Sequence, residues 1–192
     1  MATLVIDPAR TALLAMDLLE MMRQRPLAPY GGPEVFGRAA KLLAGFRLKG
    51  GFVVLVRVGF SADGKDRLAP PCDSPMTSSA SFHADAYKLV PELNVQPADH
   101  IVTKRQWGAF FGTDLDLQLR RRGIQTLVLS GIATAFVVES TAREAYERGY
   151  RQIFAEDAMT SSSAEEHQVA VTRIFPRIGL VRSTDDILSA LG

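Results

Sequence analysis

The sequence predicts a single α/β domain in which a parallel sheet lies between two layers of helices, a three-layer α/β/α architecture. Apolar runs alternate with segments of helical spacing, which is typical of α/β domains. Most of these runs are continuously apolar, which indicates strands buried on both faces of a parallel sheet. The 192 residues suit one domain with one core, and we find no internal repeat.

Six apolar runs bounded by turn residues are the predicted strands. TALLAMD, GFVVLVRVG and TLVLSG are the clearest, because long aliphatic and β-branched stretches dominate them. The predicted strands cover residues 11–17, 51–59, 100–103, 126–131, 151–155 and 178–183.

Helical spacing of apolar residues predicts the connecting elements. Four helices are expected between the strands, and a fifth segment closes the chain as a last helix. These helices cover residues 33–49, 114–122, 135–148, 164–175 and 185–191.

One segment, residues 60–97, breaks the alternation and is rich in Pro, Ser, Asp and Ala. A loop of this length in a compact domain is usually functional or disordered. Because it follows the carboxyl end of a predicted strand, we expect a lid or a contact between subunits. The single cysteine, Cys72, lies in this loop with no helix start beside it to lower its pKa, so we expect an ordinary loop thiol.

Composition limits the classes of partner. Twenty-two Lys and Arg residues against 21 Asp and Glu residues give a formal net charge of +1, which gives no electrostatic case for nucleic acid or an anionic membrane. A small-molecule ligand is expected instead. One cysteine excludes an internal disulfide, and no stretch reaches about 18 apolar residues. The start MATLVIDPAR lacks the features of a signal peptide, so a cytoplasmic protein is predicted.

The turn after TLVL, in SGIATAFVVESTAREAYERGY (130–150), is the expected place for chemistry, because open α/β sheets bind ligands at the carboxyl ends of their strands. Its first residues, IATAFVVES, contain no cysteine, histidine or lysine. Glu139 is the carboxylate there, and the helix that follows could simply expose it to solvent. The turn therefore offers no obvious nucleophile.

Three charged residues near strand ends are candidates for a site. Asp17 ends the first predicted strand, and a carboxylate there is either an acid/base or a cap for the next element. Lys104 follows HIVT, where it either binds an anionic group or is a solvated strand-end lysine. Arg57 lies within an apolar strand, which implies a substrate carboxylate or an internal salt bridge as its partner.

Other site classes find no support in the sequence. His83, His100 and His167 lie far apart with no metal-ligand spacing, so we expect structural histidines and no metal. There is no Gly-x-Gly-x-x-Gly after a strand, no phosphate-binding loop and no Gly-x-Ser-x-Gly elbow. No cofactor is predicted.

Several segments together carry a resemblance to a known family. They are Asp17 after the first strand, KRQWGAFFGTDL (104–115), LRRRGIQTLVLSGIAT (119–134), VESTAREAYERGY (138–150) and AEDAMTSSSAEEHQ (155–168). With them the chain resembles the isochorismatase-like hydrolases, or cysteine hydrolase superfamily, from Ala12 to Leu188. The resemblance implies a Rossmann-like parallel six-stranded sheet, one isochorismatase-like hydrolase domain over 1–192, and a homodimer or higher homo-oligomer.

The resemblance also implies a catalytic arrangement. The family's triad is an aspartate, a lysine and a cysteine, and the first two match Asp17 and Lys104. The family carries a cis peptide that falls here between Ile132 and Ala133. By analogy, it would aim the backbone N–H groups of Ala133 and of position 137 at a developing oxyanion.

The cysteine of the triad has no counterpart. Aligning Gly131, Thr134, Thr141 and Arg143 with the family pattern Gly-x-x-Thr-x-x-Cys-Val-x-x-Thr-x-Arg places the cysteine's position at Val137. An isopropyl group has neither a lone pair nor a proton to move, so an acyl-enzyme cannot form there. The Asp-x-His metal site of nicotinamidase-type members is also missing after the second strand, which argues against that activity.

Two functions follow from the resemblance. In the first, the chain is similar to the true isochorismatases and their relatives that have glycine at the cysteine's position and hydrolyse a vinyl ether by acid catalysis. Asp17 would be the acid, and Lys104 and Arg57 would hold substrate carboxylates. In the second, the chain has lost hydrolysis and is a binding or assembly protein.

Two further residues complete the set of substrate-binding candidates beside Arg57. Thr134, which matches the first threonine of the family pattern, is one of them. Trp107 belongs to an aromatic cluster with Phe110 and Phe111. Aromatic residues at this spacing are more often core or a subunit contact than a substrate cage, and an oligomer would allow Trp107 to be both.

Overall fold

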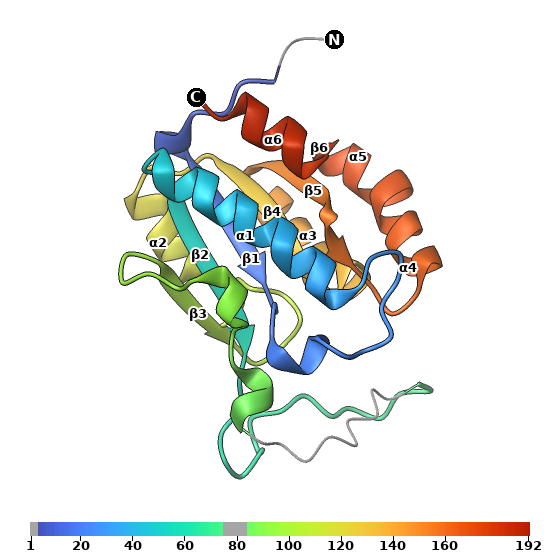
Figure 1. Cartoon of the computed structure of the whole chain (residues 1–192). Coiled ribbons are helices and arrows are strands. Elements are labelled where there is room, and N and C mark those ends of the chain that lie inside the picture. The colour runs from blue at the N-terminus through green and yellow to red at the C-terminus, as the bar shows by residue number, and fades with distance from the viewer. Residues whose placement is uncertain (1–3, 75–83) are drawn as a thin grey trace.

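A six-stranded parallel sheet lies between two layers of helices in the computed structural model, which describes residues 4–74 and 84–192 (Figure 1). Every strand pairing is parallel, and the strand order is β3-β2-β1-β4-β5-β6. The strands are β1 (Thr11–Met16), β2 (Phe52–Val58), β3 (His100–Lys104), β4 (Thr126–Ile132), β5 (Arg151–Thr160) and β6 (Leu180–Arg182). The predicted fold class is confirmed.

One strand, β5, is longer than predicted. It continues to Thr160 instead of ending near residue 155. Beyond a register shift, Met159 pairs with Gly131 and Thr160 pairs with Ile132. The acidic pair Glu156 and Asp157 lies at this irregularity, so the apolar run stops while the strand goes on.

The helices also occur where helical spacing predicted them. They are α1 (Gly32–Leu48), α2 (Leu115–Arg121), α3 (Glu139–Glu147), α4 (Ala164–Val169), α5 (Phe175–Ile178) and α6 (Thr184–Ala190). Wider π turns, Thr134–Val138 and Ala170–Ile174, precede α3 and α5. Four short 3-10 turns cover Pro8–Arg10, Glu20–Met22, Ala84–Tyr87 and Pro91–Leu93. Among the described residues, no helix is long and apolar enough to cross a membrane.

The two helical layers bury different sets of strand side chains. On one face, α1 packs through Phe36, Leu43 and Phe46 with strand residues such as Leu13 and Leu55, and α6 adds Ile187. On the other face, α2, α3 and α5 cover strand residues such as Leu14 and Val56. Because side chains alternate along each strand, a residue's position in its strand decides which layer it meets.

The long loop after β2 is described only in part. Its end is fixed along the segment after β1, because the Val90 N–H donates to the Leu18 carbonyl at 3.1 Å and the Glu20 N–H donates to the Lys88 carbonyl at 3.0 Å. Cys72 is an exposed free thiol. The tip, including His83, lies outside the described residues, so the expected lid or subunit contact stays a prediction.

The order of strands reverses between β1 and β4, which is where open α/β sheets bind ligands. Met16 pairs with Gly131 at the carboxyl ends of these strands. Gly131 has a φ of 138°, and a Cβ there would collide with the Met16 carbonyl. This glycine allows the two backbones to approach at the switch point.

Substitution of this glycine should cost more stability than any ordinary glycine substitution. We expect Gly131→Ala to lower the free energy of unfolding by about 3 kcal/mol or more, because it adds a steric collision to an unfavourable φ. Gly37→Ala is the matched control, since Gly37 is exposed within α1 with nothing within 4 Å of an added Cβ. It should raise stability by about 0.5–1 kcal/mol. If Gly131→Ala and Gly37→Ala changed the free energy of unfolding in urea equally, the close approach of β1 and β4 at Gly131 would be refuted.

Candidate active site

Asp17 lies immediately after β1 and is almost fully buried, at 3% exposure. Its backbone is left-handed, with a φ of 51°, and its N–H donates to the Val56 carbonyl at 2.8 Å. One carboxylate oxygen, Oδ1, accepts the Val58 N–H at 2.8 Å, and Oδ2 accepts from Nζ of Lys104 at 2.7 Å. The carboxylate therefore does not cap the next element; it joins the ends of β1, β2 and β3.

Lys104 is equally buried, at 2% exposure, and is the last residue of β3. It pairs with Val58 in the neighbouring strand, which brings its ammonium to Asp17. Nζ also donates to the Gln106 carbonyl at 3.0 Å. Lys104 is therefore not a solvated strand-end lysine, and one of its three N–H donors has no partner among the described residues.

Burial strengthens the affinity of Asp17 for a proton. Burial raises the pKa of the Asp17 carboxyl above its ordinary value, because removal from water penalises the charged form. The charge of Lys104 and the hydrogen bonds from Lys104 and Val58 act in the opposite direction without cancelling it. An acid with a raised pKa in a buried position is typical of a catalytic proton donor.

The end of β4 contributes an unusual backbone. A cis peptide bond joins Ile132 to Ala133, at the position that the sequence predicted. The Ala133 carbonyl then accepts from Phe136, Val137 and Val138, with N–O distances of 3.3, 2.9 and 3.2 Å. The Val137 N–H is therefore occupied within the π turn, and its expected place among oxyanion donors is not supported.

No nucleophilic group lies at Val137. Its side chain is 8% exposed and belongs to the hydrophobic cluster on the α3 face of the sheet. The single thiol of the chain, that of Cys72, is exposed on the long loop. Among the described residues, no group of three or more His, Cys, Asp or Glu side chains is placed to hold a metal ion.

Thr134 makes a contact that the sequence did not suggest. The residue is fully buried, and its hydroxyl oxygen lies 2.9 Å from Nδ1 of His167 at the end of α4. The other ring nitrogen of His167 lies 3.9 Å from the Glu156 carboxylate. Thr134 and His167 thus fix the turn after the cis peptide to a second helix. The two residues are 33 positions apart in the sequence and share no motif, so the sequence carried no signal of this pairing.

Arg57 does not join Asp17 and Lys104. Its Nε donates to the Thr103 hydroxyl at 3.2 Å, and among the described residues it forms no ion pair. Arg57 and Leu55 share one face of β2, the face that α1 covers, whereas Lys104 is in register with Val58 on the other face. Of the two partners considered for Arg57, an internal salt bridge is not found among the described residues, and the two cations lie on opposite faces of the sheet.

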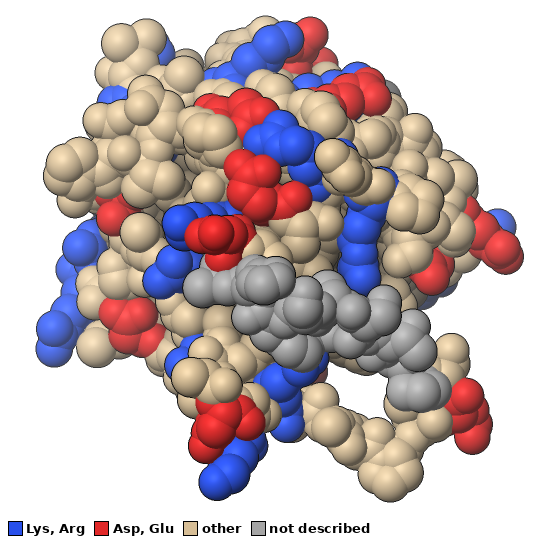
Figure 2. Space-filling view, turned by 60° about the horizontal axis from the view of Figure 1, so that its bottom comes forward, with Lys and Arg blue, Asp and Glu red and all other residues tan. Residues whose placement is uncertain are grey.

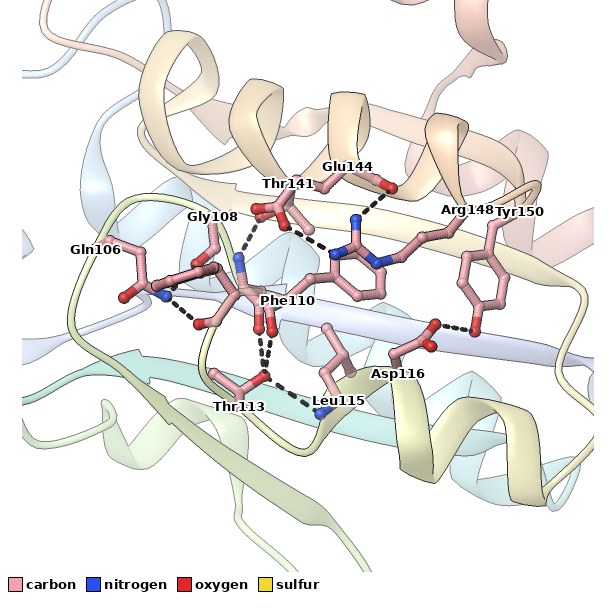
Figure 3. A network of polar contacts seen from close by, with 12 residues as sticks. Gln106, Gly108, Phe110, Thr113, Leu115, Asp116, Thr141, Glu144, Arg148 and Tyr150 are labelled. Atoms are coloured by element: carbon pink, nitrogen blue, oxygen red, sulfur yellow. Dashed lines mark hydrogen bonds and ion pairs between the residues drawn. The ribbon is translucent and has the colours of Figure 1, made fainter.

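The loop that carries Trp107 is anchored on α3 (Figure 3). The Ala109 N–H donates to the Thr141 hydroxyl at 3.1 Å, and that hydroxyl donates to the Val137 carbonyl at 2.8 Å. Glu144, also on α3, lies so close to Gly108 that a Cβ there would collide with its carboxylate.

The aromatic cluster divides between core and surface. Phe110 is buried and belongs to the core, whereas Phe111 is exposed. Trp107 is half-exposed, and its ring centroid lies 5.0 Å from that of Phe136 in the π turn. Trp107 is thus not a core residue of this chain, and it lies over the segment that contains Val137.

A family model and several relatives match this chain. The model for the isochorismatase domain matches residues 11–186. The uncharacterized isochorismatase family protein YwoC of Bacillus subtilis is 52% identical over 98% of this chain and 97% of its own length. The uncharacterized isochorismatase family protein YecD of Escherichia coli O157:H7 is 45% identical over 98% of this chain and 100% of its own length.

A solved structure and a named hydrolase extend the comparison. An isochorismatase family protein from Burkholderia thailandensis superposes with a TM-score of 0.92 at 41% identity, covering 98% of each chain. Ureidoacrylate amidohydrolase RutB of Methylobacterium radiotolerans is 35% identical over 127 residues, which are 66% of this chain and 48% of that protein.

Removal of the buried cation should destabilise the fold in a pH-dependent way. We expect Lys104→Met to lower the free energy of unfolding by about 3–5 kcal/mol at neutral pH, because it leaves a buried carboxylate unpaired. Without the cation, the pKa of Asp17 in the folded state rises further above that in the unfolded chain. A folded pKa that is raised favours folding at low pH, and this contribution is lost as pH rises through it. The loss should therefore be smaller at acidic pH.

Urea unfolding of the parent and the variant at acidic and neutral pH measures this difference. The double variant Asp17→Asn, Lys104→Met is the control, because it has no charge at this position. It should recover most of the stability at neutral pH. A Lys104→Met variant as stable as the parent would contradict the buried pair.

Proposed function

The chain belongs to the isochorismatase family, and on that premise we propose that this hydrolase cleaves a small enol (vinyl) ether by acid catalysis, with Asp17 as the proton donor and no cysteine nucleophile. The observation that carries the proposal is the buried Asp17 carboxyl with its raised pKa, held by Lys104 at the switch point of the sheet. A carboxylic acid that keeps its proton is what such a reaction requires.

The proposed reaction needs no covalent intermediate with the protein. Asp17 gives its proton to the terminal carbon of the enol ether, and water adds to the oxocarbenium ion that results. The hemiketal then collapses to an alcohol and a carbonyl compound, and a proton from the water restores Asp17. Lys104 stabilises the Asp17 carboxylate that forms once the proton has left.

Several candidates keep a role around Asp17 in this proposal. The third N–H of Lys104 is available for a carboxylate on the substrate, as are the terminal nitrogens of Arg57 if the substrate spans the sheet edge. The Ile132–Ala133 peptide and Thr134 follow directly at the end of β4, the strand beside β1. Trp107, with Phe136, offers an aromatic surface at the entrance.

Two other mechanisms have less support. Thiol-dependent amide cleavage would require a nucleophile at Val137 or a transfer of that role to Cys72, which is exposed on the long loop. A binding or assembly protein would have no need of a carboxyl and an ammonium buried together, since burial of such a pair is costly.

Two broader expectations stay predictions. We infer a homo-oligomer, because Trp107 and Phe111 expose aromatic surface that a second copy could cover. The near-neutral formal charge and the single cysteine agree with a cytoplasmic protein.

A hydrolysis screen tests the proposed reaction directly. The purified protein is assayed with isochorismate and with small amides such as nicotinamide, maleamate and N-carbamoyl compounds, beside Asp17→Asn and Val137→Cys. We expect turnover of the enol ether that falls at least 100-fold in Asp17→Asn, since loss of a general acid removes about 10²–10⁴ of rate. A silent parent with amidase activity only in Val137→Cys would contradict the proposal.

The pH dependence of turnover tests the state of Asp17. If the protonated carboxyl is the acid, kcat/KM falls as pH rises through the raised pKa of Asp17. Lys104→Met should move this fall to higher pH, because removal of the cation raises that pKa further. A fall at the same pH in both proteins would assign the titration to another group.

A further inference from the structure

A polar cleft lies at the amino ends of the strands, whereas Asp17 follows the carboxyl end of β1. Its volume is about 190 Å³, which suits a small molecule and not a polymer. The segment before β1 forms one wall through Val5 and Ile6, and the starts of β1, β4 and β5 form the floor. Its polar lining residues are Asp7, Arg10, Thr11, Gln125, Thr126 and Arg151.

Backbone hydrogen bonds place three of these residues in a row. The Gln125 N–H donates to the Arg10 carbonyl at 2.9 Å, and the Arg151 N–H donates to the Gln125 carbonyl at 3.0 Å. Neighbouring strands lie about 4.8 Å apart. The backbones of Arg10 and Arg151, on either side of Gln125, are therefore separated by about twice that distance. These backbone hydrogen bonds fix the positions of the Cα atoms of both arginines.

Several side chains of the cleft have hydrogen-bonding groups without a partner among the described residues. Within the described residues, neither guanidinium of Arg10 and Arg151 has an ion-pair or hydrogen-bond partner, and the Gln125 amide has none either. The Thr11 hydroxyl, which lines the cleft, also has none. These groups are open to solvent and not buried without a partner, because the one such buried side-chain atom among the described residues is Oε1 of Gln152.

The charges of the cleft favour an anion. Two arginines face a single acid, Asp7, and one oxygen of Asp7 already accepts the Ala9 N–H at 3.0 Å. Guanidinium groups match the planar oxygen pairs of carboxylates and phosphates, and a threonine hydroxyl adds a further donor. We propose that this cleft is a binding site for a small oxyanion, a carboxylate or a phosphate, distinct from the site of hydrolysis.

Binding can be measured without any turnover. The full chain, labelled with ¹⁵N, is titrated separately with inorganic phosphate and with succinate at constant ionic strength set by chloride. We expect saturable shifts of the amide signals of Thr11, Thr126 and Arg151 with at least one probe, and the stronger probe identifies the preferred oxyanion. Signals around Asp17 and Lys104 report separately on the hydrolytic site.

Substitutions assign the binding to the cleft. Arg10→Gln, Arg151→Gln and Thr11→Val should each weaken it, the two arginine changes at least tenfold. Arg121→Gln is the control, because Arg121 is an exposed arginine at the end of α2 that does not line the cleft, and it should leave binding unchanged. Thermal unfolding checks that every variant is folded. Shifts that do not saturate with either probe, or that weaken equally in Arg121→Gln, would overturn the proposal.

Discussion

The organisation of the site depends on one buried ion pair, between Asp17 and Lys104. Neither residue has enough exposed surface to be hydrated, so each charge must be compensated by its partner and by backbone groups. The compensation comes from the ends of β2 and β3, through the Val58 N–H and the Gln106 carbonyl. The pair therefore joins the carboxyl ends of β1, β2 and β3, and the same burial raises the pKa of Asp17.

The neighbouring strand β4 contributes backbone features beside this pair, and not charged side chains. Gly131 allows the closest approach to β1, and the cis peptide that follows directs the chain into the π turn. The amides of that turn converge on one carbonyl, that of Ala133. Position 137 is consequently held by main-chain geometry whatever its side chain is.

The parts of the structure that follow from local pattern could be predicted from the sequence. Continuous apolar runs predicted all six strands, and the motifs shared with the family identified Asp17, Lys104 and the cis peptide. Contacts between distant segments were different. The hydrogen bond between Thr134 and His167 depends on how α4 packs. Strand β5 extends beyond its apolar run because its second half is held by pairing with β4. The alternation of side chains in β2 could have separated Arg57 from Lys104, had their register been known.

Thr141 has a consequence that reaches beyond its own two hydrogen bonds. Its hydroxyl is simultaneously a donor to Val137 and an acceptor from Ala109, so a single oxygen atom couples the π turn to the loop of Trp107. A ligand that displaces the π turn would therefore also displace the loop of Trp107. Because this loop carries the only indole of the chain, the coupling has a built-in optical reporter.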